Sequence, residues 1–202
     1  IISHYALLVS LHVNSGTLKI IEVCKMKISG CKEGNITFAE MSNEYIELVK
    51  AWVAKPHVCR WWTDSWSEEI FQDTSYKKNE SFIHGSMITC IDDVPIGLSQ
   101  LYFSSSSPET SLSCDECGLR LFIGDAKYLK QKLGRVIISK LVEGIFRATK
   151  IERIVCEPQA DNWPAIISLK RAKFRDHGRV RRANLSLVRL SLPRNLVEKK
   201  LK

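Results

Sequence analysis

Apolar side chains recur at helical spacing in two stretches of this chain. The later series predicts a long amphipathic helix and consists of Leu133, Val136, Ile137, Leu141, Val142, Ile145 and Phe146. The earlier series predicts a helix over 46–53, with Asn43 as its N-cap residue. Two shorter helices are predicted, one at 66–72 and one after Asn162, where Pro164 suits the first turn.

Apolar runs bounded by turn residues predict strands between these helices. The runs cover 35–39, 82–91, 95–103, 118–123, 151–156, 174–180 and 184–192. Asp92, Asp93 and Val94 join two of them in the manner of a hairpin turn, and the serines and proline of 104–110 predict a flexible loop. Because the middle strands follow one another without helices, the order predicts a mixed α/β sandwich and excludes a doubly wound sheet.

Length and composition are those of an ordinary globular protein. The 202 residues are 45% apolar and 26% charged, which suits one large domain or one domain with an extension. The longest apolar stretches fall well short of the roughly 20 residues that span a bilayer, so a membrane span is excluded. We expect the domain at 26–192, beginning near Met26, with 1–25 as an N-terminal extension and 193–202 as a basic tail.

Seven cysteines are scattered along the chain. Their odd number and irregular spacing are not those of a secreted disulfide framework, so we expect a reduced, cytoplasmic protein. Cys114 and Cys117 have the spacing of a metal knuckle, but no second pair accompanies them. The sequence therefore predicts no metal site.

Charge is distributed unevenly along the chain. Residues 1–126 carry 10 Lys/Arg against 16 Asp/Glu, and residues 127–202 carry 20 against 6. The resulting net charges of −6 and +14 predict two different surfaces, one suited to a cationic ligand and one to an anionic ligand. A solvated basic face is the alternative interpretation.

Several motifs, taken in order, resemble a known family. Residues 46–62, which include Pro56-His57-Val58 and Trp61-Trp62, are similar to the opening of aminoglycoside 6'-N-acetyltransferases and their siderophore-biosynthesis relatives. Pro95-Ile96-Gly97 resembles the central hairpin of these enzymes, which belong to the GNAT superfamily. Three later motifs resemble its acetyl-CoA-binding core: Phe122-Ile123-Gly124-Asp125, Leu133-Gly134-Arg135 and Asp161-Asn162-x-x-Ala165-Ile166. Over about 27–192, the resemblance implies a GNAT-like mixed, mostly antiparallel central sheet flanked by helices, with splayed central strands.

The resemblance also implies where acetyl-CoA, the expected cosubstrate, binds. The basic loop 127–132 leads into the N-terminus of the long helix, where unpaired N–H groups and the helix dipole suit a pyrophosphate. The implied cofactor-binding residues are Phe122, Ile123, Gln131, Lys132, Leu133, Gly134, Arg135 and Asn162.

The loop departs from the family's glycine-rich pattern. Aligned through Gly134, the family puts glycines at Lys130 and Lys132, where a glycine would allow positive φ and close approach to phosphate. An alternative register keeps Gln131 and Gly134 but places Val136 at the last small position. Both alignments predict an altered phosphate loop.

Positions that carry chemistry in the family are altered as well. The tyrosine that many members use as an acid corresponds to Leu169, and an acidic residue of the central strand corresponds to Arg120. Lys173 stands where the family has a glycine. Glu157 matches a carboxylate that contributes to amine recognition, and we expect it to be the catalytic residue that steers the amine and accepts its proton.

The acceptor is expected to meet aromatic and polar side chains. An aromatic wall can stack on a sugar or support an amine, and residues two apart on a strand share one face. The expected substrate-binding residues are Trp61, Trp62, Gln100, Tyr102, Asp115 and Glu116.

Three functions follow as hypotheses. The leading one is an acetyl-CoA-dependent N-acetyltransferase, monomeric or homodimeric, in which a primary amine of a small, aminoglycoside-like molecule attacks the thioester directly. The second is a catalytically degenerate relative that binds CoA or nothing, as Arg120, Leu169, Lys130 and Lys132 suggest. The third is nucleic-acid binding through the basic run 171–182, which no recognised nucleic-acid motif accompanies.

Overall fold

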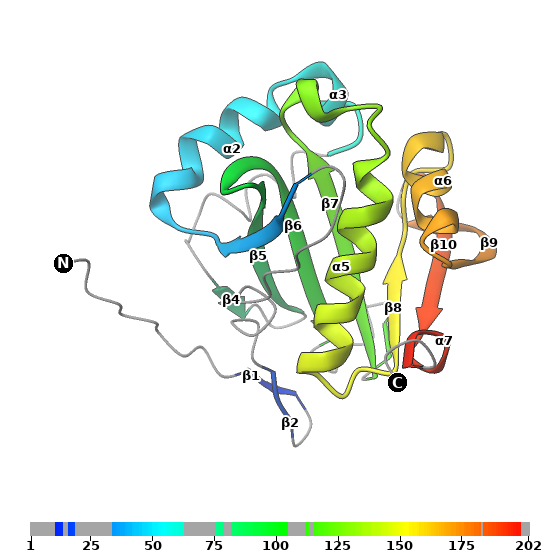
Figure 1. The fold of residues 1–202 in the computed structure, drawn as a ribbon. Helices are drawn as coiled ribbons and strands as arrows, with labels where there is room; N and C mark the ends of the chain where they lie inside the picture. Colours follow the sequence, from blue (N-terminus) through cyan, green and yellow to red (C-terminus); the bar gives the residue numbers. More distant parts are fainter. Residues whose placement is uncertain are drawn as a thin grey trace.

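A computed structural model of the chain shows one large sheet with helices on both faces (Figure 1). It describes residues 11–13, 16–18, 34–62, 76–78, 82–104, 112–113, 115–182 and 184–198. Eight strands form the main sheet, in the spatial order β3-β5-β6-β7-β8-β10-β9, with β4 also beside β5. Within the described residues, every pairing of this sheet is antiparallel except β7–β8.

The strands of the main sheet are β3 (Ile36–Glu40), β4 (Tyr76–Lys78), β5 (Phe82–Ile91), β6 (Val94–Ser104), β7 (Glu116–Ile123), β8 (Arg153–Cys156), β9 (Arg175–Arg182) and β10 (Leu185–Pro193). The helices are α2 (Ile46–Val53), α3 (Pro56–Cys59), α5 (Leu133–Ala148), α6 (Trp163–Arg171) and α7 (Asn195–Glu198), with 3-10 turns η1 (Asn43–Tyr45) and η2 (Ala126–Tyr128). A separate antiparallel pair joins β1 (Leu11–Val13) and β2 (Gly16–Leu18). The expected α/β fold class, a mostly antiparallel sheet flanked by helices, is confirmed.

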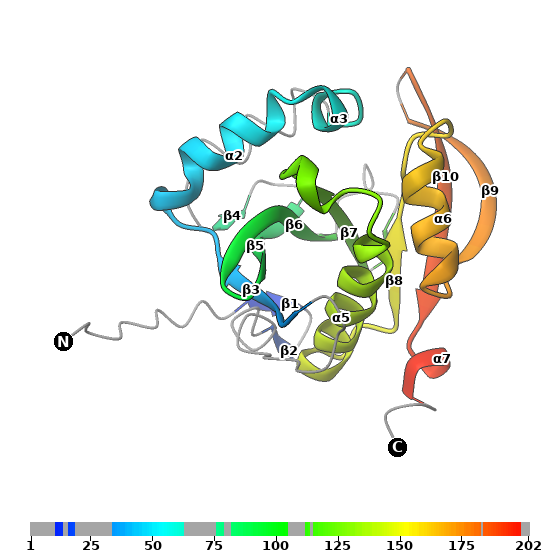
Figure 2. The ribbon, with the colours of Figure 1, turned by 45° about the horizontal axis from the view of Figure 1, so that its top comes forward.

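Different helices cover the two faces of the sheet (Figure 2). α5 lies across one face with α6 beside it, and together they bury the larger core, in which Leu141 and Ile145 are fully buried. α2 and α3 lie over the other face, where Val49 and Trp52 anchor a smaller core. Because alternate side chains of a strand point to opposite faces, β7 contributes to both cores.

The predicted central hairpin is confirmed. β5 and β6 pair antiparallel along most of their length, joined at Asp92 and Asp93. Both aspartates have positive φ, 48° and 64°, as the two central residues of a type I′ turn require. The Asp92 carboxylate also accepts a hydrogen bond from the N–H of Asn35 at 2.9 Å, which joins the turn to the start of β3.

Some predictions of local structure are wrong, some fall outside the described residues, and some strands were not predicted. The prediction that Asn43 caps the first long helix is wrong, because Asn43 opens the turn η1, which has Ser42 as its N-cap, and α2 follows from Ile46. The helix at 66–72, most of the loop at 104–110 and the boundary at Met26 lie outside the described residues. The three-residue strands β1, β2 and β4 were not expected, since runs so short carry little periodicity.

α6 begins and ends as its sequence indicates. The Asn162 side chain accepts a hydrogen bond from the N–H of Ala165 at 3.2 Å, which makes it the predicted N-cap. At the other end, Phe174 N–H reaches Leu169 O at 3.1 Å while Lys173 adopts φ 76°. This is a Schellman motif with lysine at the position that usually carries glycine, which agrees with the glycine that the resemblance implies at Lys173.

Candidate active site

β7 and β8 pair over only three residues before they diverge. The last pair is Gly118 with Val155. β7 continues to Ile123, paired with β6 as far as that residue, but beyond Gly118 its other edge is not paired with β8. We call this divergence the fork. Backbone N–H and C=O groups on an edge that another strand does not engage can pair with an extended ligand.

The far end of β7 is held by the segment around α3. Lys55 Nζ donates to the carbonyl of Gly124 at 3.1 Å, and His57 Nε2 donates to the carbonyl of Ile123 at 3.1 Å. Trp52 packs so closely on Gly124 that a Cβ there would overlap the indole. His57 therefore acts as an anchor for the strand that forms one arm of the fork.

The loop from β7 to α5, together with the end of β7 before it and the first turn of α5 after it, carries most of the expected cofactor-binding residues. The Asp125 carboxylate accepts a hydrogen bond from the N–H of Lys127 at 3.1 Å, and Gln131 Nε2 donates to the Lys127 carbonyl at 2.6 Å. Lys130 and Lys132 both have φ 62°, in the left-handed region that favours glycine. The alignment through Gly134, which puts glycines at these two positions, agrees with this backbone.

The start of α5 is suited to an anion. Lys132 is its N-cap residue and makes no side-chain capping bond, so the first N–H groups of the helix lack intrahelical acceptors. The side chains of Lys130, Lys132 and Arg135 are exposed here, whereas Leu133 is buried in the core. A Cβ at Gly134 would lie 3.2 Å from Ser168 Oγ, so the glycine allows α6 to pack close beside this end of α5.

The two expected acceptor tryptophans have different surroundings. Trp62 is buried and lies edge-to-face against Phe122, with 4.8 Å between ring centroids. Trp61 is partly exposed, and the Arg60 guanidinium lies 4.5 Å from its ring centroid. Because the Phe122 ring packs in the core under α2, its contact with a ligand in the fork would be through its backbone.

A polar chain crosses the sheet from β5 to β7. Arg120 Nε donates to Gln100 Oε1 at 2.7 Å, and Gln100 Nε2 donates to Ser86 Oγ at 2.8 Å. Gln100 has no exposed surface, so its amide positions neighbours and does not meet a ligand from solvent in this arrangement. The Arg120 guanidinium also lies 5.3 Å from the Trp62 ring centroid and 5.6 Å from that of Tyr102.

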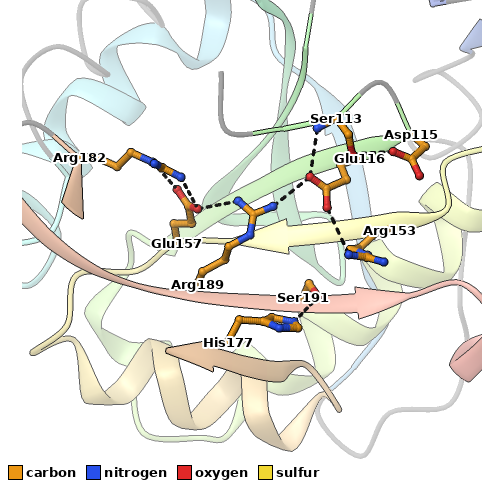
Figure 3. A network of polar contacts seen from close by, with 9 residues as sticks. All are labelled: Ser113, Asp115, Glu116, Arg153, Glu157, His177, Arg182, Arg189 and Ser191. Carbon is orange, nitrogen blue, oxygen red and sulfur yellow. Dashed lines mark hydrogen bonds and ion pairs between the residues drawn. The ribbon is translucent and has the colours of Figure 1, made fainter. Parts of the chain in front are cut away.

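Arg189 joins the closed end of the fork to the end of β8 (Figure 3). Its guanidinium lies 2.9 Å from a carboxylate oxygen of Glu116 and 2.9 Å from one of Glu157. Arg182 contacts both Glu157 oxygens, at 3.1 and 3.3 Å, and Arg153 lies 3.6 Å from Glu116. The two carboxylates are 11% and 7% exposed, so both are largely buried and engaged by arginines.

This network changes the expected role of the acids. Glu157 stands beside the fork, but its carboxylate is shared between Arg182 and Arg189. Glu116 is likewise engaged, while Asp115 is exposed and accepts a hydrogen bond from Ser113 Oγ at 2.6 Å.

Sequence reasoning did not select the three arginines of the network as site residues. One signal was present for Arg189, a single charge between the apolar Val188 and Leu190 of a strand. One partner, Glu116, lies on β7, and the other, Glu157, directly follows β8; they are 73 and 32 residues away in the chain. The alternation of apolar and charged residues therefore indicated that Arg189 is unusual, but it could not identify the carboxylates that Arg189 contacts.

Three other side chains near the fork, Leu169, Cys117 and Cys156, act neither as proton donors nor as nucleophiles. Leu169 is 5% exposed and packs in the core beside Phe174, so the position that carries an acid in many relatives offers no proton here. Burial raises the pKa of the Cys117 and Cys156 thiols, which keeps both protonated at neutral pH and makes them poor nucleophiles.

The basic run 171–182 forms the end of α6 and the strand β9 at the edge of the sheet. Arg175, Arg179 and Arg181 are exposed there. Charged side chains on an edge strand oppose edge-to-edge association, so this placement alone does not indicate a nucleic acid.

The described residues form neither a metal-ligand cluster nor a membrane-spanning helix. Among them, no three His, Cys, Asp or Glu side chains gather as metal ligands. None of the described helices is long and apolar enough to cross a membrane.

Comparisons with known proteins agree with this geometry. Residues 42–182 match the family model for the acetyltransferase (GNAT) domain. The chain is similar to aminoglycoside acetyltransferase AAC(6')-Ib in complex with coenzyme A, with TM-score 0.68 and 22% identity over 83% of this chain and 99% of that one. An aminoglycoside N(6')-acetyltransferase from Legionella pneumophila gives TM-score 0.65 and 19% identity over 85% and 99%. RimJ of Mycobacterium smegmatis in complex with CoA-disulfide gives TM-score 0.60 and 10% identity over 82% of this chain and 85% of that one. No curated protein matches.

Proposed function

Because the chain belongs to the GNAT acetyltransferase family, we propose that it transfers the acetyl group of acetyl-CoA to a primary amine of a small molecule. An aminoglycoside-like acceptor is the class we favour, since AAC(6')-Ib, similar in fold, has been crystallised with kanamycin, paromomycin and ribostamycin. A hydroxylysine-like amine is the alternative acceptor.

The fork is the observation that carries this proposal. Beyond Gly118 one edge of β7 is not paired with β8, and the pantetheine arm of CoA is an extended chain with amide groups that can take the place of a strand there. The backbone groups of Phe122 and Ile123 belong to this arm of the fork.

The start of α5 would hold the pyrophosphate. Its outward N–H groups and the positive end of the helix dipole favour an anion. Lys132, Gly134 and Arg135 would contact the phosphates, Gln131 would hold the loop through Lys127, and Asn162 would fix the start of α6 beside them.

The chemistry follows from the groups beside the fork. The neutral amine attacks the thioester carbonyl carbon directly, with no covalent enzyme intermediate. The thiols nearest the fork, Cys117 and Cys156, are buried and stay protonated, so neither is a nucleophile for this step. Glu157 is the carboxylate we assign to amine recognition and proton acceptance, and to do so it must be released by the exposed Arg182. Trp61 and Asp115 are the exposed groups that would face the acceptor.

A second candidate is a relative that binds CoA without catalysis. Leu169 in the core and two lysines in left-handed backbone favour it. Calorimetric titration with acetyl-CoA, followed by detection of released CoA thiol in the presence of kanamycin or lysine, distinguishes the two. Micromolar binding, about −8 kcal/mol, with amine-dependent thiol release supports the enzyme. Binding without release supports the second candidate. No binding at millimolar acetyl-CoA contradicts the enzyme and leaves a degenerate relative that binds nothing.

A further inference from the structure

Tyr102 lies at the point where the fork opens. It sits on β6 opposite Gly118 of β7, and Gly118 is the last β7 residue that pairs with β8. A methyl group at Gly118 would overlap Cζ and both Cε atoms of the phenol ring. The ring therefore lies flat across β7, and the absence of a side chain at Gly118 makes room for it.

The same contact gives the direction of the hydroxyl. Neighbouring strands lie about 4.8 Å apart, and Cζ, the atom that bears the hydroxyl, is the ring atom nearest to the Cβ position of Gly118. The hydroxyl is one bond further from β6, so it extends past the middle of β7 toward β8. Cys156, Glu157 and Arg120 are close enough to act on its titration. The phenol oxygen thus reaches the opening between the two strands.

The surroundings of this hydroxyl make it a proton donor. Burial raises the pKa of Tyr102, so the group keeps its proton throughout the neutral range. The Arg120 guanidinium, 5.6 Å from the ring centroid, acts in the opposite direction and favours the phenolate. The phenol is therefore protonated at rest. Burial opposes the loss of its proton, and the Arg120 guanidinium favours that loss by stabilising the phenolate, so the cation is what makes proton donation from this position feasible.

We propose that the Tyr102 hydroxyl protonates the thiolate that leaves during acetyl transfer, which rests on the function proposed above. The amine nitrogen forms a bond to the acetyl carbon while the C–S bond breaks. The hydroxyl proton passes to the sulfur to give CoA thiol, the amine nitrogen loses its proton to the Glu157 carboxylate, and the phenolate is reprotonated from solvent.

This role connects two departures from the family. The acid that many relatives carry on the helix after the fork is replaced by Leu169, which lies in the core. The acid on the central strand is replaced by Arg120, which lies beside Tyr102. A tyrosine on β6 becomes an anion when it gives up its proton. A nearby cation stabilises that anion, whereas a carboxylate at the same position would destabilise it.

Tyr102→Phe tests the role, since it removes the hydroxyl and keeps the ring over Gly118. With acetyl-CoA and kanamycin as probes, we expect kcat to fall about 100-fold, while the Kd of acetyl-CoA from calorimetry and the urea midpoint stay within the range of the wild type. A solvent deuterium isotope effect on kcat is expected in the wild type and is lost in the variant. Tyr45→Phe, which alters a partly buried tyrosine at the start of α2 that packs against the smaller core, is the matched control and should keep wild-type kcat.

The outcomes separate the two proposals. An unchanged kcat in Tyr102→Phe, or a loss explained by weaker acetyl-CoA binding or unfolding, overturns the role of Tyr102 and leaves the acetyltransferase function standing. A wild type that fails to bind acetyl-CoA overturns the proposed function itself. Binding without turnover on any amine tested overturns both catalytic claims and leaves a CoA-binding protein.

Discussion

Arg182 holds Glu157 by two contacts, with Nη2 and Nε of the guanidinium 3.1 and 3.3 Å from the two carboxylate oxygens. The arginine side chain is 43% exposed and the glutamate only 11%. The carboxylate that we propose for amine recognition is therefore occupied by the chain's own cation. Access of an acceptor to Glu157 depends on whether the exposed partner can be displaced.

Replacing Arg182 by Gln is expected to make Glu157 more available to a cationic amine. The KM for kanamycin should fall about two- to fivefold, the equivalent of about 0.5–1 kcal/mol for a partly exposed ion pair, with the KM for acetyl-CoA unchanged. Arg179→Gln is the control, because Arg179 is exposed on the same strand and forms no ion pair with the described residues. Steady-state kinetics of both variants check this, and an equal change in the two contradicts it.

Replacing Arg189 by Met is expected to destabilise the fold. The guanidinium is 20% exposed and bridges two largely buried carboxylates. Glu157 keeps Arg182 and Glu116 keeps Arg153 at 3.6 Å, so the loss of Arg189 leaves the buried charge only partly compensated and lowers the free energy of unfolding by about 2 kcal/mol. Urea unfolding followed by tryptophan fluorescence measures the loss. Adding Glu116→Gln to Arg189→Met should recover part of it, and a single-variant loss below about 1 kcal/mol would contradict a buried network.

Two substitutions at Lys132 separate charge from backbone conformation. Lys132→Gln and Lys132→Gly each remove one exposed cation, so both should weaken acetyl-CoA binding by about 0.5–1 kcal/mol. Lys132 has φ 62°, and glycine adopts this conformation without strain. The free energy of unfolding of Lys132→Gly should therefore be about 1 kcal/mol higher than that of Lys132→Gln. Calorimetry and urea unfolding measure the two effects, and equal stability of the variants would rule out strain at this position.

Acid should remove a small stabilising contribution from Asp176. The hydrogen bonds from the Lys170 ammonium, at 2.7 Å, and from the N–H of Gly178 lower the pKa of this carboxyl below its ordinary value of 3.8. The folded pKa is the lower one, so the contribution is complete above about pH 5 and disappears as pH falls through the folded pKa.

Asp176→Asn should therefore cost about 0.5 kcal/mol at pH 7, a value reduced by the exposure of the pair, and almost nothing near pH 2. Urea midpoints across this range measure the difference. Asp161→Asn, which removes an exposed contact of 4.0 Å to Arg60, is the comparison and should have a smaller effect at pH 7. A constant difference between wild type and Asp176→Asn at every pH would refute the linkage.

Local signals account for most of the fold that could be predicted. The apolar series from Leu133 to Phe146 placed α5, and Asn162 with Pro164 placed the start of α6, because helix periodicity and capping act over a few residues. Capping was less decisive at Asn43, where a 3-10 turn precedes α2 and takes Ser42 as its cap. Ser42 and Asn43 are both good N-cap residues, and the sequence pattern alone could not decide between neighbouring candidates.

The candidate site was predicted in part, because some of its features depend on residues close together in the chain and others do not. The fork, the loop and the start of α5 follow the order of motifs along the chain, and the glycine positions of the family fall on lysines whose backbone is left-handed. The engagement of Glu157 by Arg182 and Arg189 was missed because these residues lie 25 and 32 positions away, on other strands.

The sequence by itself determined the elements, their order and the family resemblance, since hydrophobic period, caps and turn residues depend on near neighbours in the chain. The tertiary structure alone decided which charges meet and that the Tyr102 ring lies over Gly118. Both depend on the register between strands: Glu116 reaches Arg189 across 73 residues, and Tyr102 reaches over β7 only because Gly118 stands opposite it. Register is a property of the assembled sheet, where a shift of one residue would turn each of these side chains to the other face.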